Sequence, residues 1–339
     1  MALKMQAAAS ITEEFAAKIK RDNQRDRIIQ YAPIFVLIAM ILVFTAVCGT
    51  DFASAANVRA ILNQLAIPLL VAIGLTFVIM IGSIDLSING TVGMAGSILG
   101  VLALNSQTSL NLGFLGIVLA VLSSVTVGLL IGLIHVYLKI PSFMVSFSFM
   151  FICRGFGLLS YAGQPPSLLD PVLVEIPRMA FLGIPVITWI ALAVLVLCIF
   201  IQNFTAFGRY IYAVGTDETI LKSVGVSVNR VKVMVFTLAG FCFGVAGVIG
   251  CIRLGQGQVM VGDGLMFPAQ AAVVVGGTAL SGGKGGVTNT IVGVLVMTIL
   301  ANGLVLMGVN PYIRTGIEGL IILAAVALTV ARGAKVISK

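Results

Sequence analysis

The chain has 339 residues, of which 59% are hydrophobic and only 9% are charged, and its formal net charge is +8. A soluble domain is usually about a quarter charged, so this composition excludes a water-soluble globular protein. The charges gather in residues 1–30, near 204–232 and at the C-terminus, and apolar runs long enough to span a bilayer separate them. The basic residues do not form a nucleic-acid-binding patch, and we predict an all-α polytopic membrane protein.

Residues 1–30 are predicted to form a cytoplasmic N-terminal tail. Ser10-Ile11-Thr12-Glu13 has the form of a capping box, and apolar residues then recur at helical spacing beside several Lys and Arg residues. This pattern is typical of a short amphipathic helix on the surface of the lipid bilayer. A frayed tail with a chance apolar stripe fits the same residues equally well.

About ten spanning helices are predicted between residues 31 and 332, which form the transmembrane domain. The segments are 31–49, 62–82, 90–105, 113–138, 141–160, 181–202, 231–253, 264–282, 287–309 and 314–332. Glycines interrupt 90–105 and 264–282, so we expect broken or partial helices there.

The distribution of Lys and Arg predicts the topology of the chain. Cytoplasmic loops are enriched in these residues, which places the N-terminal tail, the 204–230 loop and the C-terminal tail at 333–339 in the cytoplasm. The 161–180 loop then lies on the opposite side. Three arginines go against this trend, namely Arg59, Arg178 and Arg253.

The 204–230 loop carries the clearest functional signal, because its middle has the marks of a short helix. These marks are a capping residue, an acidic first turn, a basic last turn and a terminating glycine (Thr216 or Asp217, Glu218, Lys222 and Gly225). Ile220, Leu221 and Val224 are expected on one apolar face. A helix of about eight residues is marginal alone, so it needs the lipid surface or a protein partner. A solvated connection is the alternative.

A glycine-rich stretch at 271–286 contains Gly-Gly-Lys but does not fit a phosphate-binding loop. Thr278 stands where the first glycine of that motif belongs, and Gly285 replaces its Ser or Thr. We interpret the stretch as a tightly packed helix end followed by a turn, with the packing glycines Gly276, Gly277, Gly282 and Gly283. The five cysteines lie in or beside apolar runs without metal-ligand spacing, so neither a metal site nor catalytic residues are predicted.

The chain resembles the inner-membrane permease subunits of bacterial ABC importers for ribose and related monosaccharides. The likeness runs from about residue 31 to 332 and depends on the order and spacing of several motifs. These are Ile84-Asp85-Leu86-Ser87, Pro141-Ser142-Phe143, Arg154-Gly155, Thr205-Ala206-Phe207-Gly208-Arg209, Ala213-Val214-Gly215, Gly225-Val226, Gly276 to Gly283, and Asn302-Gly303-Leu304. Permeases for branched-chain amino acids and nucleosides are more distant relatives.

The resemblance implies an importer subunit that pairs with a second copy or a paralogue and encloses a translocation path. In this family a periplasmic binding protein delivers the sugar, and a separate cytoplasmic ATPase binds ATP and Mg²⁺. The chain itself is then neither an enzyme nor the holder of a cofactor. The helix at 217–224 matches the family's coupling helix, which binds the ATPase. The residues expected to form or support this contact are Arg209, Asp217, Glu218, Ile220, Leu221, Lys222, Val224 and Gly225.

A sugar route needs a few polar groups that match hydroxyls. The candidates along this path are Asp85, Ser87, Asn89 and Asn302. Arg154 lies inside a predicted span and is unfavourable there unless it is paired or faces water. The alternative function is a stand-alone ion-coupled carrier of a small polar solute, but the chain has no array of buried carboxylates of the kind such carriers often need.

Overall fold

The computed structural model describes residues 31–330, and it is an all-α membrane protein. Within this range, seven helices are long and apolar enough to cross a membrane. They are Tyr31–Cys48, α3 (Ala55–Met80), α5 (Phe114–Tyr137), α6 (Ser142–Ser160), α8 (Val186–Phe204), α11 (Val228–Leu254) and α13 (Val287–Leu306). The bundle also contains α4 (Ile88–Leu102), α12 (Met266–Val275) and α14 (Pro311–Val330).

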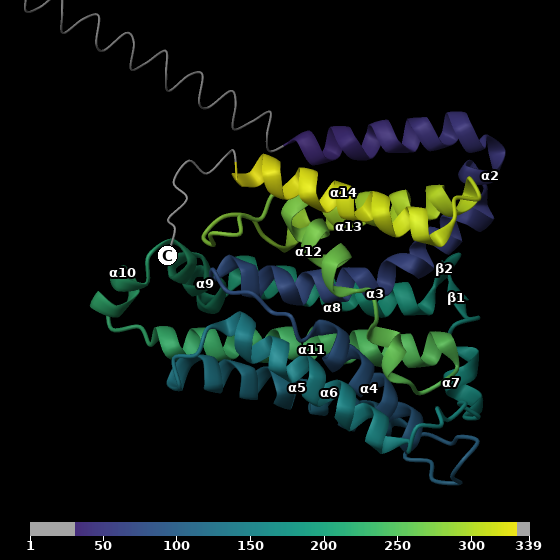
Figure 1. Cartoon of the computed structure of the whole chain (residues 1–339), viewed down its shortest axis with the longest axis horizontal. Coiled ribbons are helices and arrows are strands. Elements are labelled where there is room, and N and C mark those ends of the chain that lie inside the picture. Colours follow the sequence, from purple (N-terminus) through teal and green to yellow (C-terminus); the bar gives the residue numbers. More distant parts are fainter. Residues whose placement is uncertain (1–30, 331–339) are drawn as a thin grey trace, which may run out of the picture.

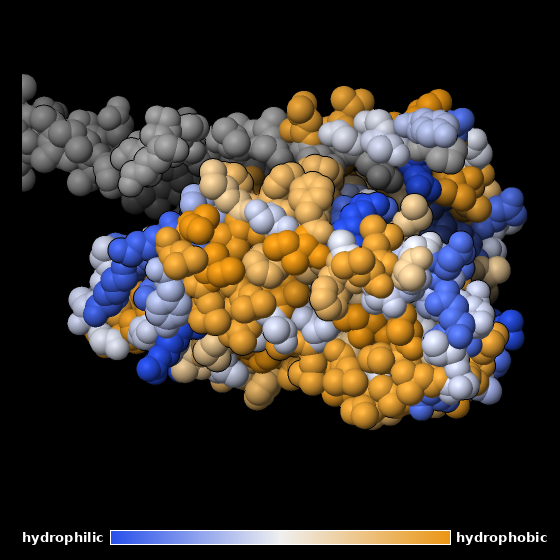
Figure 2. Space-filling view, turned by 60° about the horizontal axis from the view of Figure 1, so that its bottom comes forward, coloured by the Kyte–Doolittle hydropathy of each residue, from blue (hydrophilic) through white to orange (hydrophobic). Residues whose placement is uncertain are grey.

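The helices lie side by side along the length of the molecule, and smaller elements gather at its two ends (Figure 1). One end, here called the α10 end, carries α9 (Ala206–Thr216) and α10 (Glu218–Ser223). The other, the α7 end, carries α2 (Thr50–Ala53), α7 (Pro171–Glu175) and a hairpin of β1 (Ala180–Phe181) and β2 (Ile184–Pro185). Figure 2 shows an apolar surface between these hydrophilic ends, as expected for a protein surrounded by lipid.

The centre of the bundle is formed by α3 and α11, each of which has 16 buried residues. Small residues allow α11 to approach α5 closely, since a Cβ at Gly240 would overlap the carbonyl oxygen of Ser124. Thr76 on α3 and Thr290 on α13 share a hydrogen bond of 2.7 Å between their hydroxyls. The core is therefore held by close backbone packing and a few satisfied polar contacts.

The two segments expected to be broken or partial helices are partial helices in the structure. α4 has 15 residues and α12 has ten, and non-helical backbone interrupts the chain before each of them. An extended stretch precedes α4, and Ser142 and Ser146 of α6 accept hydrogen bonds from its Ile84 and Leu86 N–H groups at 3.1 and 2.9 Å. These bonds matter because non-helical backbone at membrane depth must find partners inside the protein. The second segment contains only the ten residues of α12, between the 3₁₀ turn η1 (Val259–Gly262) and an irregular loop at 276–286.

Several predicted boundaries are wrong. The span expected at 62–82 begins at Ala55, because the Ser54 hydroxyl caps the helix by accepting from the Asn57 N–H at 3.1 Å. The span expected at 181–202 is α8 and begins only after the β1–β2 hairpin. The predictions for residues 1–30 and 333–339 concern segments outside the described residues.

Candidate functional site

The 204–230 loop contains two helices, of which only the second was expected. The first, α9, is capped by Thr205, whose hydroxyl accepts from the Gly208 N–H at 3.2 Å. Its Ile211 and Val214 side chains are buried, and Arg209 is exposed. The amphipathic pattern of α9 is present in the sequence, but its length of 11 residues is too short to stand out as a span.

A hydrogen-bond network around Tyr212 fixes α9 to the rest of the α10 end. The Tyr212 hydroxyl accepts from the Gln202 amide of α8 at 3.0 Å and donates to the Gly285 carbonyl oxygen at 2.8 Å. The side-chain amide oxygen of Gln202 in turn accepts from the Val287 N–H, at the start of α13, at 2.7 Å. The network therefore joins α8, α9 and α13.

The glycine-rich loop at 276–286 packs against α9 and the end of α3. The Gly283 N–H donates to the carbonyl oxygen of Met80 at 2.9 Å, and a Cβ at Gly215 of α9 would overlap this same oxygen. Gly282 lies against Gly82, with a φ of +83° that favours glycine. The loop thus forms the packing surface for α9 at this end of the molecule.

The other two glycines singled out in this loop differ from each other. A Cβ at Gly276 would come 2.6 Å from the carbonyl oxygen of Asn289, so this glycine allows α12 to pack closely on α13. Gly277 has a φ of +95° and no neighbouring atom where its Cβ would lie. Gly277 is therefore required by the backbone conformation of the turn and not by close packing.

The short helix α10 has the expected N-terminal cap, and Asp217 provides it. The Asp217 carboxylate accepts from the Thr219 N–H at 2.8 Å and from the Thr219 hydroxyl at 2.6 Å. These bonds, the side-chain one first, lower the pKa of Asp217 below its ordinary value. Thr216 belongs to the last turn of α9. Gly225 follows the helix with a φ of +78°, the left-handed conformation common after helix ends.

The apolar face expected on α10 is only partly correct. Leu221 is 5% exposed and packs into the core, whereas Ile220 is 61% and Val224 68% exposed. Neighbouring helical residues point about 100° apart, so Ile220 and Leu221 lie on different faces of α10. One residue anchors the helix and the other two project outward from the α10 end.

Ion pairs connect α10 to the first turn of α11. The Glu218 carboxylate pairs with Lys222, one turn along α10, at 3.8 Å and with Lys232 of α11. Lys222 is exposed, while Lys232 is largely covered. The carboxylate therefore bridges the two helices and fixes the direction of α10.

The polar residues expected along a substrate path lie in two separate places. Asp85 and Ser87 are buried before α4, where the Ser87 N–H donates to the Asp85 carboxylate at 2.7 Å. The Asn89 side-chain oxygen accepts from the N–H of Met266, the first residue of α12, at 3.1 Å. Asn89 thus joins the two interrupted segments.

Asn302 lies far from the other three candidates. Its amide donates to Asn57 near the start of α3 at 3.0 Å. Asn57 and Met80 lie near opposite ends of α3, about 35 Å apart at 1.5 Å per residue. The structure therefore does not bring Asn302 together with Asp85, Ser87 and Asn89.

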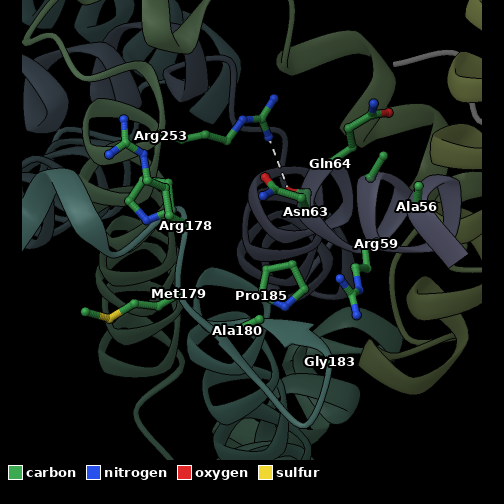
Figure 3. Close-up of a pocket in the computed structure, with 12 residues that line it drawn as sticks. Ala56, Arg59, Asn63, Gln64, Arg178, Met179, Ala180, Gly183, Pro185 and Arg253 are labelled. Atoms are coloured by element: carbon green, nitrogen blue, oxygen red, sulfur yellow. Dashed lines mark hydrogen bonds between the residues drawn. The ribbon is translucent and has the colours of Figure 1, made fainter.

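A second polar site is a cavity of about 510 Å³ at the α7 end, lined by α3, residues 177–185 and the end of α11 (Figure 3). Its lining includes Arg59, Arg178 and Arg253, the three arginines that go against the charge trend. Arg253 donates to the Asn63 carbonyl oxygen at 3.3 Å, and Arg178 pairs with Glu175 at 3.6 Å. The cavity is therefore positively charged.

Comparison with known proteins identifies the family. The family model described as "Branched-chain amino acid transport system / permease component" matches residues 57–326. The chain belongs to this permease family. The permease is 34% identical to the ribose import permease protein RbsC of Haemophilus influenzae, over 86% of this chain and 90% of that protein.

Two further relatives show the range of the family. The permease is 33% identical to the RbsC protein of Bacillus subtilis, over 94% of this chain and 98% of that protein. It is 30% identical to the autoinducer 2 import system permease protein LsrC of Salmonella paratyphi B, over 86% and 83% of the two chains. No solved structure matches the permease. These relatives and the apolar helices make it a ribose-type ABC importer permease and a multi-pass inner-membrane protein.

Proposed function

We propose that this permease carries a monosaccharide, such as a ribose-like pentose, a hexose or a related sugar, into the cytoplasm, driven by a separate ATPase that binds at α10. The observation that supports the coupling site is the exposure of Ile220 and Val224 on a helix that the buried Leu221 anchors to the core. Exposed apolar side chains at a hydrophilic end of the molecule favour a protein partner. Two of the relatives are named as import permeases for ribose and for autoinducer 2, and these names support the substrate class.

In this proposal the α10 end and both chain termini lie in the cytoplasm. The ATPase, with ATP and Mg²⁺ bound, favours one position of α10, and each position of the permease opens the path to one side. Movement of α10 reaches the bundle through α9, because Tyr212 and Gly215 connect α9 to the loop at 276–286. The permease residues move and bind but form no covalent intermediate.

The α7 end would then face the periplasm and receive the sugar-binding protein. The arginine-lined cavity at this end favours an acidic surface on that partner, since opposite charges steer association. A second permease copy or a paralogue completes the path.

The test is purification of the permease from its native host in mild detergent, followed by identification of the proteins that accompany it. We expect an ABC ATPase with the wild-type chain and its loss from the double variant Ile220→Asp/Val224→Asp. Leu221 is left unchanged because an aspartate at this buried site would disrupt the loop itself.

A control adds one negative charge beside the contact surface. Ser227 is exposed and precedes α11, where an aspartate is a favourable cap, so Ser227→Asp should keep the ATPase. A permease that purifies without any ATPase, or an Ile220→Asp/Val224→Asp variant that keeps it, would contradict the proposed coupling site.

A further inference from the structure

An ion pair lies on the membrane-spanning surface where the two interrupted segments meet. Arg154 of α6 donates from its two terminal nitrogens to the two carboxylate oxygens of Asp263, at 3.0 and 3.4 Å. Asp263 stands between η1 and α12, next to the point where Asn89 bonds to the first N–H of α12. The pair therefore joins α6 to the junction of α4 and α12.

The pair lies well within the span of α6. Arg154 is about 18 Å from the start of α6 and about 9 Å from its end at 1.5 Å per residue. Phe147, Phe151 and Leu158 lie on the same face of α6 as Arg154, and all three are exposed. Phe267, one turn along the chain from Asp263, is exposed as well. The charges are thus set in an apolar surface.

The exposure of the pair is inconsistent with contact with lipid. The Arg154 and Asp263 side chains are 44% and 40% exposed, although each is satisfied by the other. Charged side chains inside the membrane almost always face protein or water, because hydrocarbon cannot solvate them. This part of the surface therefore needs a polar environment.

We propose that Arg154 and Asp263 face the aqueous translocation path and contact the hydroxyl groups of the sugar as it passes. This inference rests on the proposed function. The guanidinium group supplies only donors and the carboxylate only acceptors, so together they match a pair of neighbouring hydroxyls, each of which can donate and accept. The exposed phenylalanines beside the pair can pack on the apolar face of a sugar ring.

The buried polar residues of the interrupted segments have a different role. Asp85, Ser87 and Asn89 use their polar groups to hold the non-helical backbone in place. They position α4 and α12, whereas Arg154 and Asp263 present charge to the path.

The first test measures water access at Gly155, which is exposed and has open space where a Cβ would lie. The variant Gly155→Cys is treated in membranes with a charged thiosulfonate reagent, in the complete importer. Val196→Cys is the matched control, because Val196 is exposed at the middle of α8. We expect Gly155→Cys to react about tenfold faster or more, since only a hydrated thiol forms the reactive thiolate. The unchanged chain gives the background of its own cysteines.

The second test measures selectivity in the reconstituted importer with its own ATPase and binding protein. Arg154→Lys and Asp263→Asn should each lower sugar uptake by about tenfold or more, because a hydrogen bond to a charged group is lost. They should also change the ratio of D-ribose to D-xylose uptake. A pair with a purely structural role would lower the amount of assembled permease and leave this ratio unchanged.

The outcomes separate this inference from the proposed function. A wild-type importer without ATP-dependent uptake of any sugar tested would contradict the proposed function. Normal wild-type uptake with an unreactive Gly155→Cys, or with unchanged selectivity in both charge variants, would overturn the present inference alone. Spontaneous disulfide-linked dimers of Gly155→Cys without reagent labelling would also overturn it, by showing an interface between copies.

Discussion

The hydroxyl of Tyr212 donates a hydrogen bond to the carbonyl oxygen of Gly285 at 2.8 Å, across 73 residues of sequence. This bond joins α9, the first helix of the 204–230 loop, to the glycine-rich loop beside α13. Without the Tyr212 hydroxyl, α9 would still be held by its buried apolar side chains, but its hydrogen bonds to Gly285 and to Gln202 of α8 would be lost. Force applied at α10 would then reach the bundle less directly.

Tyr212→Phe should therefore weaken coupling and leave ATPase binding intact. The variant loses two hydrogen bonds, one from Gln202 and one to Gly285, and each is expected to contribute about 1 kcal/mol. Sugar uptake per ATP hydrolysed should fall, while the amount of co-purified ATPase stays the same. Tyr210→Phe is the control, since no hydrogen bond of its hydroxyl is found within residues 31–330. Equal coupling ratios in the two variants would show that the Tyr212 bond is not used in coupling.

Gly215→Ala should push α9 away from the end of α3 and from the glycine-rich loop at 276–286. The added Cβ would overlap the Met80 carbonyl oxygen, which is backbone and cannot turn away. We expect a loss of thermal stability of about 1–3 kcal/mol from overpacking. Thermal unfolding in detergent measures it, and Gly155→Ala, at a site with open space, should have little effect. A Gly215→Ala protein as stable as wild type would contradict the close contact.

The cap of α10 should depend on pH only in acid. Because the pKa of Asp217 is lowered, its stabilisation of α10 is fully present above the ordinary value near 3.8. It is lost as the pH falls through the lowered value. The protection of amides 218–223, measured as exchange rates corrected for the intrinsic pH dependence of exchange, should therefore be constant near neutral pH and fall at strongly acid pH.

Asp217→Asn provides the comparison for this measurement. Asparagine keeps a capping oxygen but does not titrate, so the acid-dependent part of the exchange should shrink. Identical acid profiles for the variant and the wild type would show that the Asp217 cap does not cause the acid dependence.

Reversing charge at the α7 end should weaken docking of the binding protein. Arg59→Glu/Arg178→Glu is expected to raise the concentration of binding protein needed for half-maximal stimulation of ATP hydrolysis, and to reduce its dependence on salt. Basal ATP hydrolysis should not change, because the cavity lies at the opposite end from α10. An unchanged response to binding protein would exclude the cavity as a docking site.

The sequence alone determined the class of the protein, most of its spans and the existence of a short helix near 217–224. These follow from composition, from apolar length and from capping residues, which act locally. The partial helices expected at 90–105 and 264–282 are confirmed, but the glycines of the first segment do not break α4, which is continuous from Ile88 to Leu102. At Gly90, Gly93 and Gly100 they instead let neighbouring backbone approach closely.

The tertiary structure decided which side of each element is used. It turned Leu221 inward and Ile220 outward, and it separated Asn302 from Asp85. It also brought Arg154 to Asp263 across 109 residues. Periodicity in a uniformly apolar chain does not distinguish the face that meets lipid from the face that meets another helix. Only the packing of helices distant in sequence makes that distinction.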